Sequence, residues 1–144
     1  MNRRMSKSNK GFTLIEIMVV VVILGILGAL IVPNLISRPD EARVQAAISD
    51  IAQVGTALDL YRLDNGNYPS TDQGLEALVS APSGFPEARN WSQDGYLKSV
   101  PKDPWGETYL YFSEERNYEV YSYGADRKEG GEGFNKDLSS KDLK

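Results

Sequence analysis

An apolar run near the N-terminus is the feature that most constrains how this chain can fold. Residues 17–32 are apolar without interruption, and extending the run back to residue 12 gives about 21 residues, broken only by Thr13 and Glu16. At about 1.5 Å per residue, a helix of that length spans a hydrocarbon core about 30 Å thick. The sequence therefore predicts a membrane-spanning helix, and Pro33 is expected to kink it where it leaves the bilayer.

A basic leader lies in front of the apolar run. Residues 1–10 carry four cations and no anion, and because the whole chain has a net charge of −4, the rest carries −8. Cations beside a membrane helix favour the cytoplasmic side, whereas an acidic body argues against a nucleic-acid partner. A removable secretory signal peptide is an alternative, but it fits poorly because the apolar run is too long and no small-residue cleavage site follows it.

The chain contains no cysteine and no histidine. Disulfides, thiol nucleophiles, zinc-finger sites and Ser-His-Asp triads are therefore excluded. A domain outside the cytoplasm would have to hold together without a disulfide. A metal bound through oxygen ligands alone could supply the missing link.

Beyond the apolar run, the pattern becomes that of an amphipathic helix. Apolar residues recur at steps of three and four while polar side chains fall on the other faces, which is typical of a helix with one buried stripe. The Asn65-Gly66 pair then supplies a helix stop. If the helix is continuous from Phe12 to Asp64, it is about 80 Å long. The predicted stripe consists of Val44, Ala47, Ile48, Ile51, Val54, Leu58 and Tyr61.

A short helix and a long loop are expected next. Ser70 to Gln73 has the pattern of a capping box, which predicts a helix at about residues 71–80. Residues 81–106 are rich in proline, glycine and polar groups and are expected to form a packed loop. The core is expected to include Leu75, Leu78 and Trp105.

Strands are expected only near the C-terminus. Thr108 to Phe112 and Tyr118 to Tyr123 are rich in Tyr, Val and Thr, and they predict a β-hairpin to which Tyr96 to Val100 adds a third strand. From Gly124 onward the sequence is a loop rich in Gly, Asp and Lys. The expected fold class is α+β, with a long N-terminal helix packed on a small antiparallel sheet.

The segment KGFTLIE, at Lys10 to Glu16, resembles the type III signal of the type IV pilin superfamily. This resemblance implies that a prepilin peptidase cuts after Gly11 and methylates the new amino terminus at Phe12. Cleavage on the cytoplasmic side of the apolar run keeps the membrane helix. The implied divisions are a cleaved leader at 1–11, a transmembrane and assembly helix at 12–33, and a periplasmic domain at 34–144.

Glu16 needs an explanation, because an uncompensated carboxylate inside a bilayer costs a few kcal/mol or more. The resemblance implies that Glu16 pairs with the Phe12 amine of a neighbouring subunit and sets the register of a growing fibre. The alternative is that Glu16 snorkels to the cytoplasmic headgroups, since it lies only four residues from the mature end.

Three later segments resemble the major pseudopilins of type II secretion systems. They are YRLDNGNYPSTDQGLEALV (61–79), GYLKSVPKDPWGETYLY (95–111) and GADRKEGGEG (124–133). The implied fold is pilin-like: helix continuation at 34–64, short helix and loops at 65–106, β-hairpin and calcium loop at 107–144. The implied location is the inner membrane, crossed once, with the C-terminal domain in the periplasm.

The same resemblance implies a structural subunit that polymerises into a pseudopilus and drives export of folded proteins across the outer membrane. The implied partners are further copies of the chain, minor pseudopilins, an inner-membrane assembly platform, a prepilin peptidase and an outer-membrane secretin. A type IV pilin subunit, serving adhesion, motility or DNA uptake, is the alternative within the superfamily. A membrane-tethered hydrolase using Glu114 and Glu115 is the alternative of a different class.

The glycine-rich loop raises the question of a metal. Asp126, Asn135 and Asp137 offer oxygen ligands of the kind calcium takes, but EF-hand spacing is absent, and the residues alone favour a solvated acidic loop. The resemblance implies calcium ligands at Asp126 and Asp137, with a carbonyl near Tyr123. Asn135 stands where some members have an aspartate, and Lys141 where the family usually has a tryptophan.

Overall fold

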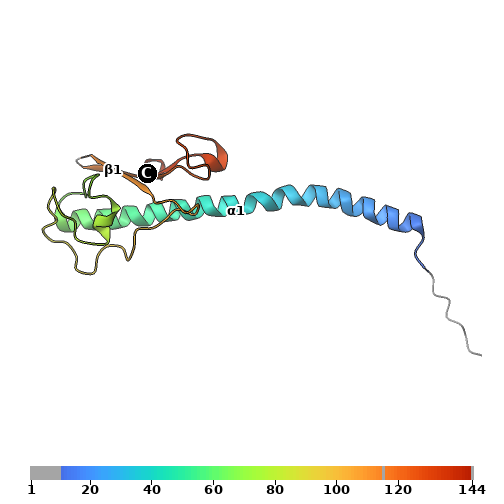
Figure 1. Ribbon diagram of the computed structural model, residues 1–144, viewed down its shortest axis with the longest axis horizontal. Coiled ribbons are helices and arrows are strands. Elements are labelled where there is room, and N and C mark those ends of the chain that lie inside the picture. The colour runs from blue at the N-terminus through green and yellow to red at the C-terminus, as the bar shows by residue number, and fades with distance from the viewer. Residues whose placement is uncertain (1–10, 115, 144) are drawn as a thin grey trace, which may run out of the picture. The chain divides into compact units, whose positions relative to one another are not determined.

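The computed structural model describes residues 11–114 and 116–143, without the side chains of residues 30–38. The chain divides into two compact units, Met1–Arg38 and Pro39–Lys144. Figure 1 shows the elements, whose order and bounds are α1 (Leu14–Asn65), η1 (Leu75–Leu78), β1 (Leu110–Glu114), β2 (Asn117–Ser122), η2 (Gly133–Asn135), β3 (Leu138–Ser139) and η3 (Ser140–Leu143), where η denotes a 3-10 helix.

Helix α1 continues through the apolar run, as expected. The apolar side chains between Phe12 and Leu27 are about half exposed or more in the single chain. Within the described residues, no helix presents an apolar stretch long enough to cross a membrane. The expected span at 12–33 and the expected kink at Pro33 extend into residues whose side chains lie outside the description.

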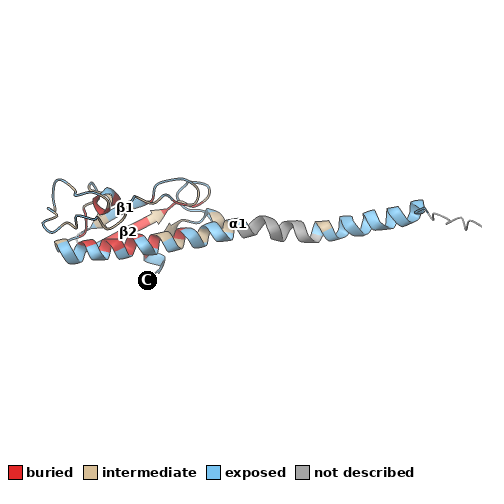
Figure 2. Cartoon of the chain, turned by 90° about the horizontal axis from the view of Figure 1, so that it is seen from below, coloured by how far each residue is buried: buried red, intermediate tan, exposed pale blue. Residues whose placement is uncertain are grey.

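The second half of α1 carries the buried stripe. Ile51, Val54, Leu58 and Tyr61 are almost completely buried, and Ala47 is buried. The other two members of the predicted stripe, Val44 and Ile48, are half-buried. Figure 2 shows these buried residues in red on the face of α1 that is turned toward β1 and β2. The period of the apolar residues thus identified the core face of the helix correctly.

The predicted helix stop is confirmed. Asn65 is the last helical residue, and Gly66 follows with φ of +83°, in the left-handed region that glycine adopts without strain. The Gly66 amide donates to the carbonyl of Arg62 at 2.7 Å, which closes the helix.

The capping box forms, but the helix behind it is shorter than predicted. The Ser70 amide donates to Gln73 Oε1 at 2.9 Å, and the Gln73 amide donates to Ser70 Oγ at 3.2 Å. Gly74 then turns to φ of +60°, so only a 3-10 helix at Leu75–Leu78 follows, in place of a helix over 71–80. Leu75 and Leu78 are buried as predicted, whereas Trp105 is half-buried.

The sheet is antiparallel with strand order β1-β2-β3, and it contains the predicted hairpin. Leu110 pairs with Tyr121 and Glu114 with Asn117, so β1 lies two residues later than expected. The predicted third strand at 96–100 is wrong. The amides of Tyr96 and Leu97 both donate to the carbonyl of Leu78, at 2.7 and 3.0 Å, which binds this segment to η1. The third strand is Leu138–Ser139, paired with β2.

Stability should depend on the buried stripe and not on exposed apolar residues of the same helix. Leu58 is 0% exposed and Leu60 is 50% exposed. Leu58→Ala is expected to lower the free energy of unfolding by about 2–5 kcal/mol, and Leu60→Ala by no more than about 0.5 kcal/mol. Urea denaturation of a fragment starting at Pro39, which contains every residue of the core cluster, would measure both. Equal losses would contradict this account of the core.

Candidate functional site

The N-terminal end of α1 carries the first group of expected functional residues. Phe12 is 80% exposed and Glu16 is exposed one turn further on. The Thr13 amide donates to Glu16 Oε2, and the Glu16 amide donates to Thr13 Oγ1, both at 3.3 Å. This is a capping box that begins the helix, and the Thr-x-x-Glu spacing could have revealed it in the sequence. Glu16 therefore has a role within its own chain.

The glycine-rich loop, residues 124–137, folds back on itself through backbone contacts. The Ala125 amide donates to the Phe134 carbonyl at 3.2 Å. A Cβ on Gly124 would lie 2.9 Å from the Lys136 carbonyl oxygen, and one on Gly131 would collide with that of Asn135. Both glycines also have positive φ. The close approach of the two limbs, residues 122–127 and 134–137, therefore requires glycine at 124, and the close approach of residue 131 to Asn135 requires glycine there.

The expected ligands lie on both limbs of this loop. Asp126 is exposed, and its Oδ1 accepts from the Lys128 amide at 3.1 Å. Asp137 is half-buried, and its Oδ2 accepts from the Gly130 amide at 2.9 Å. Asn135 is exposed in η2, and Tyr123 is half-buried directly after β2. The Ala125–Phe134 hydrogen bond joins the limb of Asp126 to the limb of Asn135.

One oxygen of this loop lacks a hydrogen-bond partner. Asp137 Oδ1 is buried and accepts no hydrogen bond within the described chain. Because buried polar atoms are nearly always paired, a carboxylate oxygen in this position suits a bound cation. The described residues hold no group of three or more acidic side chains that could bind a metal, so backbone carbonyl and amide oxygens would have to complete the ligand set.

A buried aspartate that the sequence analysis missed lies beside the loop. Asp103 is 6% exposed, and its Oδ1 accepts from the amides of Trp105 and Glu107 at 3.1 and 2.8 Å. Its Oδ2 accepts from Ser122 Oγ at 2.6 Å, and Ser122 Oγ accepts from the Gly124 amide at 3.2 Å. The turn at 103–107 is thus connected to the start of the loop. An aspartate before Pro-Trp-Gly was the available sign of such a turn.

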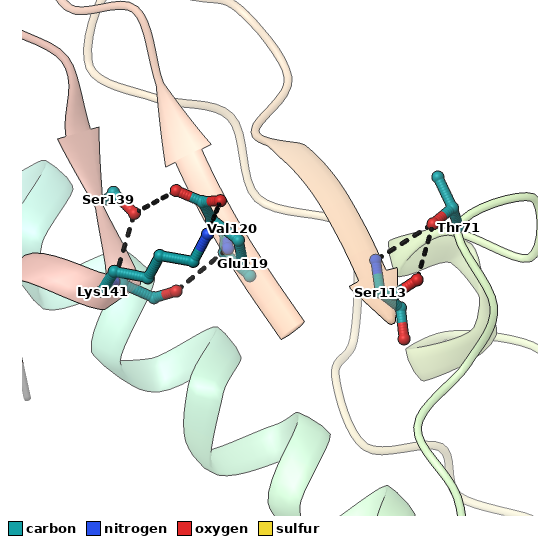
Figure 3. Close-up of polar contacts among 7 residues, drawn as sticks. Thr71, Ser113, Glu119, Val120, Ser139 and Lys141 are labelled. Atoms are coloured by element: carbon teal, nitrogen blue, oxygen red, sulfur yellow. Dashed lines mark hydrogen bonds and ion pairs between the residues drawn. The ribbon is translucent and has the colours of Figure 1, made fainter. Parts of the chain in front are cut away.

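The chain after the loop is fastened to β2 (Figure 3). Lys141 Nζ lies 2.5 Å from Glu119 Oε2, and Ser139 Oγ donates to Glu119 Oε1 at 2.7 Å. The Val120 amide donates to Ser140 Oγ at 3.1 Å. Lys141 therefore attaches the tail by an ion pair.

The opposite edge of the sheet is closed by Thr71, also drawn in Figure 3. Its hydroxyl accepts from the Ser113 amide at 3.0 Å and donates to the Ser113 carbonyl at 3.2 Å. Both backbone groups of this β1 residue are therefore satisfied by one side chain, which blunts the edge against pairing with another strand.

The tail contact should depend on pH. Hydrogen bonds from Lys141 and Ser139 hold the pKa of Glu119 below its usual value of 4.5. A depressed pKa in the folded state contributes stability above the unfolded pKa, and this stability is lost as pH falls through the folded pKa. Below about pH 4.5, wild type should therefore lose more stability than Glu119→Gln, by no more than about 1 kcal/mol. Acid titration of the melting temperature would measure this, with Glu114→Gln as a control that keeps the wild-type slope.

Two family models match this chain. Residues 6–32 match the model of the prokaryotic N-terminal methylation motif, and this match includes the start of α1. The chain is therefore one of the proteins that carry this motif. Residues 34–141 match the model of type II secretion system (T2SS) protein G. The chain belongs to the type II secretion system protein G family.

Relatives agree over nearly the whole chain. The type II secretion system core protein G of Pseudomonas aeruginosa is 55% identical, over 94% of this chain and 97% of that protein. The protein of the same name from Vibrio cholerae is 51% identical, over 93% of this chain and 92% of that protein. The crystal structure of the major pseudopilin from the type 2 secretion system of enterohaemorrhagic Escherichia coli superposes with a TM-score of 0.64 at 41% identity, covering 75% of this chain and 94% of that one.

Proposed function

We propose that this chain is a major pseudopilin, the main structural subunit of a type II secretion pseudopilus. Copies polymerise through their N-terminal helices, and the fibre drives folded proteins across the outer membrane. The observation that carries this function is the match of residues 34–141 to the protein G family, together with the fold shared with a major pseudopilin. These similarities favour a pseudopilin over a type IV pilin subunit.

Processing and membrane insertion follow from the N-terminal segment. A prepilin peptidase removes residues 1–11 and methylates Phe12, and residues 12–33 then cross the inner membrane once with the folded unit in the periplasm. The methylation motif over residues 6–32, the basic leader and the uninterrupted apolar run support this arrangement.

The fibre would meet several partners. These are minor pseudopilins, the inner-membrane assembly platform and the outer-membrane secretin, in addition to further copies of the chain. No catalytic role is proposed. Of the two glutamates considered for acid–base chemistry, Glu114 is exposed at the end of β1, and Glu115 lies outside the described residues.

Assembly requires a partner for the Glu16 carboxylate once it leaves water. The capping bonds at Thr13 are long, at 3.3 Å, and the side chain is exposed, so the second carboxylate oxygen remains accessible to another molecule. The cation closest in sequence after processing is the Phe12 amine. An amine on a neighbouring subunit would neutralise Glu16 and fix the axial register of the two helices.

Two substitutions separate charge pairing from helix capping. Glu16→Gln keeps an oxygen that can accept from the Thr13 amide but loses the negative charge. Glu16→Val loses both the capping oxygen and the charge. If charge pairing drives assembly, both variants should lose crosslinkable oligomers and secretion. Oligomers at wild-type level in Glu16→Gln would show that capping alone matters.

Mass spectrometry should find every variant beginning at N-methylated Phe12, and a chain beginning after Pro33 would refute the processing site.

We also propose that the unit Pro39–Lys144 binds calcium in its glycine-rich loop, residues 124–137. Asp126 and Asp137 supply carboxylate oxygens, the Tyr123 backbone supplies a carbonyl, and Asn135 supplies an amide oxygen. The buried, unpaired Oδ1 of Asp137 and the backbone closure between residues 125 and 134 support this assignment. Bound calcium would hold the two limbs together in a chain that has no disulfide.

Calcium should raise the melting temperature of the fragment starting at Pro39. A ligand present at a hundredfold excess over its Kd stabilises the folded state by about 2.7 kcal/mol, which corresponds to very roughly 10 °C for a unit of this size. Asp126→Ala and Asp137→Ala should each abolish the response, and Glu114→Ala should keep it. Magnesium should act far more weakly, because it demands octahedral geometry and loses water reluctantly. If wild type melts equally in chelator and in calcium, the proposed site does not exist.

A further inference from the structure

Arg127 has a backbone conformation that its side chain does not favour. Among the described residues, it is the only one other than glycine with positive φ, at 59°. A residue with a Cβ is disfavoured in this region, so contacts elsewhere must hold it there. Arg127 lies in the loop directly after Asp126, so whatever holds Arg127 also fixes the backbone of a proposed calcium ligand.

The contacts that hold Arg127 come from the turn at 103–107. Its Nη2 donates to the Trp105 carbonyl at 2.9 Å, and its Nη1 lies 3.2 Å from Glu107 Oε1. An arginine can make both contacts at once because its guanidinium presents several donors in one plane. This turn is itself rigid, because Asp103 Oδ1 accepts from two of its amides.

The turn at 103–107 makes a second attachment to the limb at 122–127. Asp103 Oδ2 accepts from Ser122 Oγ, which in turn accepts from the Gly124 amide. The limb at 122–127 is therefore attached to the turn near both ends, and Tyr123 and Asp126 lie between the two attachments. Both of these residues are proposed calcium ligands.

Polar contacts hold this limb to the turn at 103–107. A cavity of about 150 Å³ lies between the turn and the limb, and its lining includes Asp103, Glu107, Tyr123 and Arg127. Because this cavity separates part of the limb from the turn, the hydrogen bonds at the two ends of the limb are what connect the two segments across it.

We propose that Arg127 and Asp103 are positioning residues for the cation site, which hold the limb so that Asp126 and the Tyr123 carbonyl face a calcium ion before it binds. This inference rests on the calcium binding proposed above. A limb that is already ordered loses less conformational entropy on binding, so the two attachments should raise affinity. Arg127 and Glu107 are each more than half exposed, so their ion pair should contribute little to the stability of the calcium-free chain.

To test this, calorimetry would measure the calcium affinity of the full chain in detergent. The melting temperature of the same chain would be measured in chelator. Arg127→Asn suits the positive φ but removes the guanidinium. It should weaken calcium binding about tenfold, as is common for residues that orient metal ligands, with a calcium-free melting temperature within about 2 °C of wild type. Ser122→Ala, which breaks the other attachment, should also weaken binding. Arg127→Lys should recover part of the affinity through a single contact.

Arg89→Asn removes another exposed arginine, paired with Glu87 at 3.7 Å outside the loop, and should bind calcium like wild type. Wild-type affinity in Arg127→Asn would overturn the positioning role while leaving calcium binding intact. A calcium-free melting temperature that falls along with the affinity would reduce Arg127 to a general structural contact. No binding by wild type would overturn both proposals.

Discussion

The burial of one face of α1 against the sheet is the interaction on which the folded unit depends. The Tyr118 side chain of β2 reaches α1 at Gly55, where a Cβ would lie 2.8 Å from the Tyr118 hydroxyl. The Tyr118 ring also meets Tyr68 edge-on at 4.8 Å, and Tyr68 donates its hydroxyl to Asp59 on α1 at 2.7 Å. Helix, following turn and central strand are thereby fixed to one another, and the remaining segments are placed relative to this frame.

Segments too short to bury much apolar surface are placed by polar contacts. Asp103 connects its turn to the end of β2, Thr71 satisfies the edge of β1, and Glu119 fastens the tail. Such contacts are directional, and they hold loops in one conformation where packing is thin. The proposed calcium loop is of this kind: glycines allow its backbone to fold tightly, and a few side chains decide where it lies.

At the N-terminal end of α1, neither a buried core face nor long-range polar contacts are described. Here Thr13 and Glu16 cap the helix locally, and the apolar side chains that follow are exposed in the single chain. Exposed apolar surface of this extent indicates a further environment. Lipid and neighbouring helices in a fibre are the environment that the proposed function provides, and the same carboxylate would then exchange a local role for one between subunits.

The sequence by itself determined the features that repeat or act locally. The stripe from Ile51 to Tyr61, the stop at Asn65 and the hairpin follow from side-chain period and from turn chemistry within a few residues, and the motif at Lys10 to Glu16 is contiguous. Only the resemblance assigned Asp126 and Asp137 as the proposed calcium ligands. Tertiary structure alone decided the third strand, because Leu138–Ser139 is too short to show a period and pairs with a strand about 17 residues away. It alone also decided the roles of Asp103, Arg127 and Lys141, because each acts through a partner distant in sequence that no local pattern records.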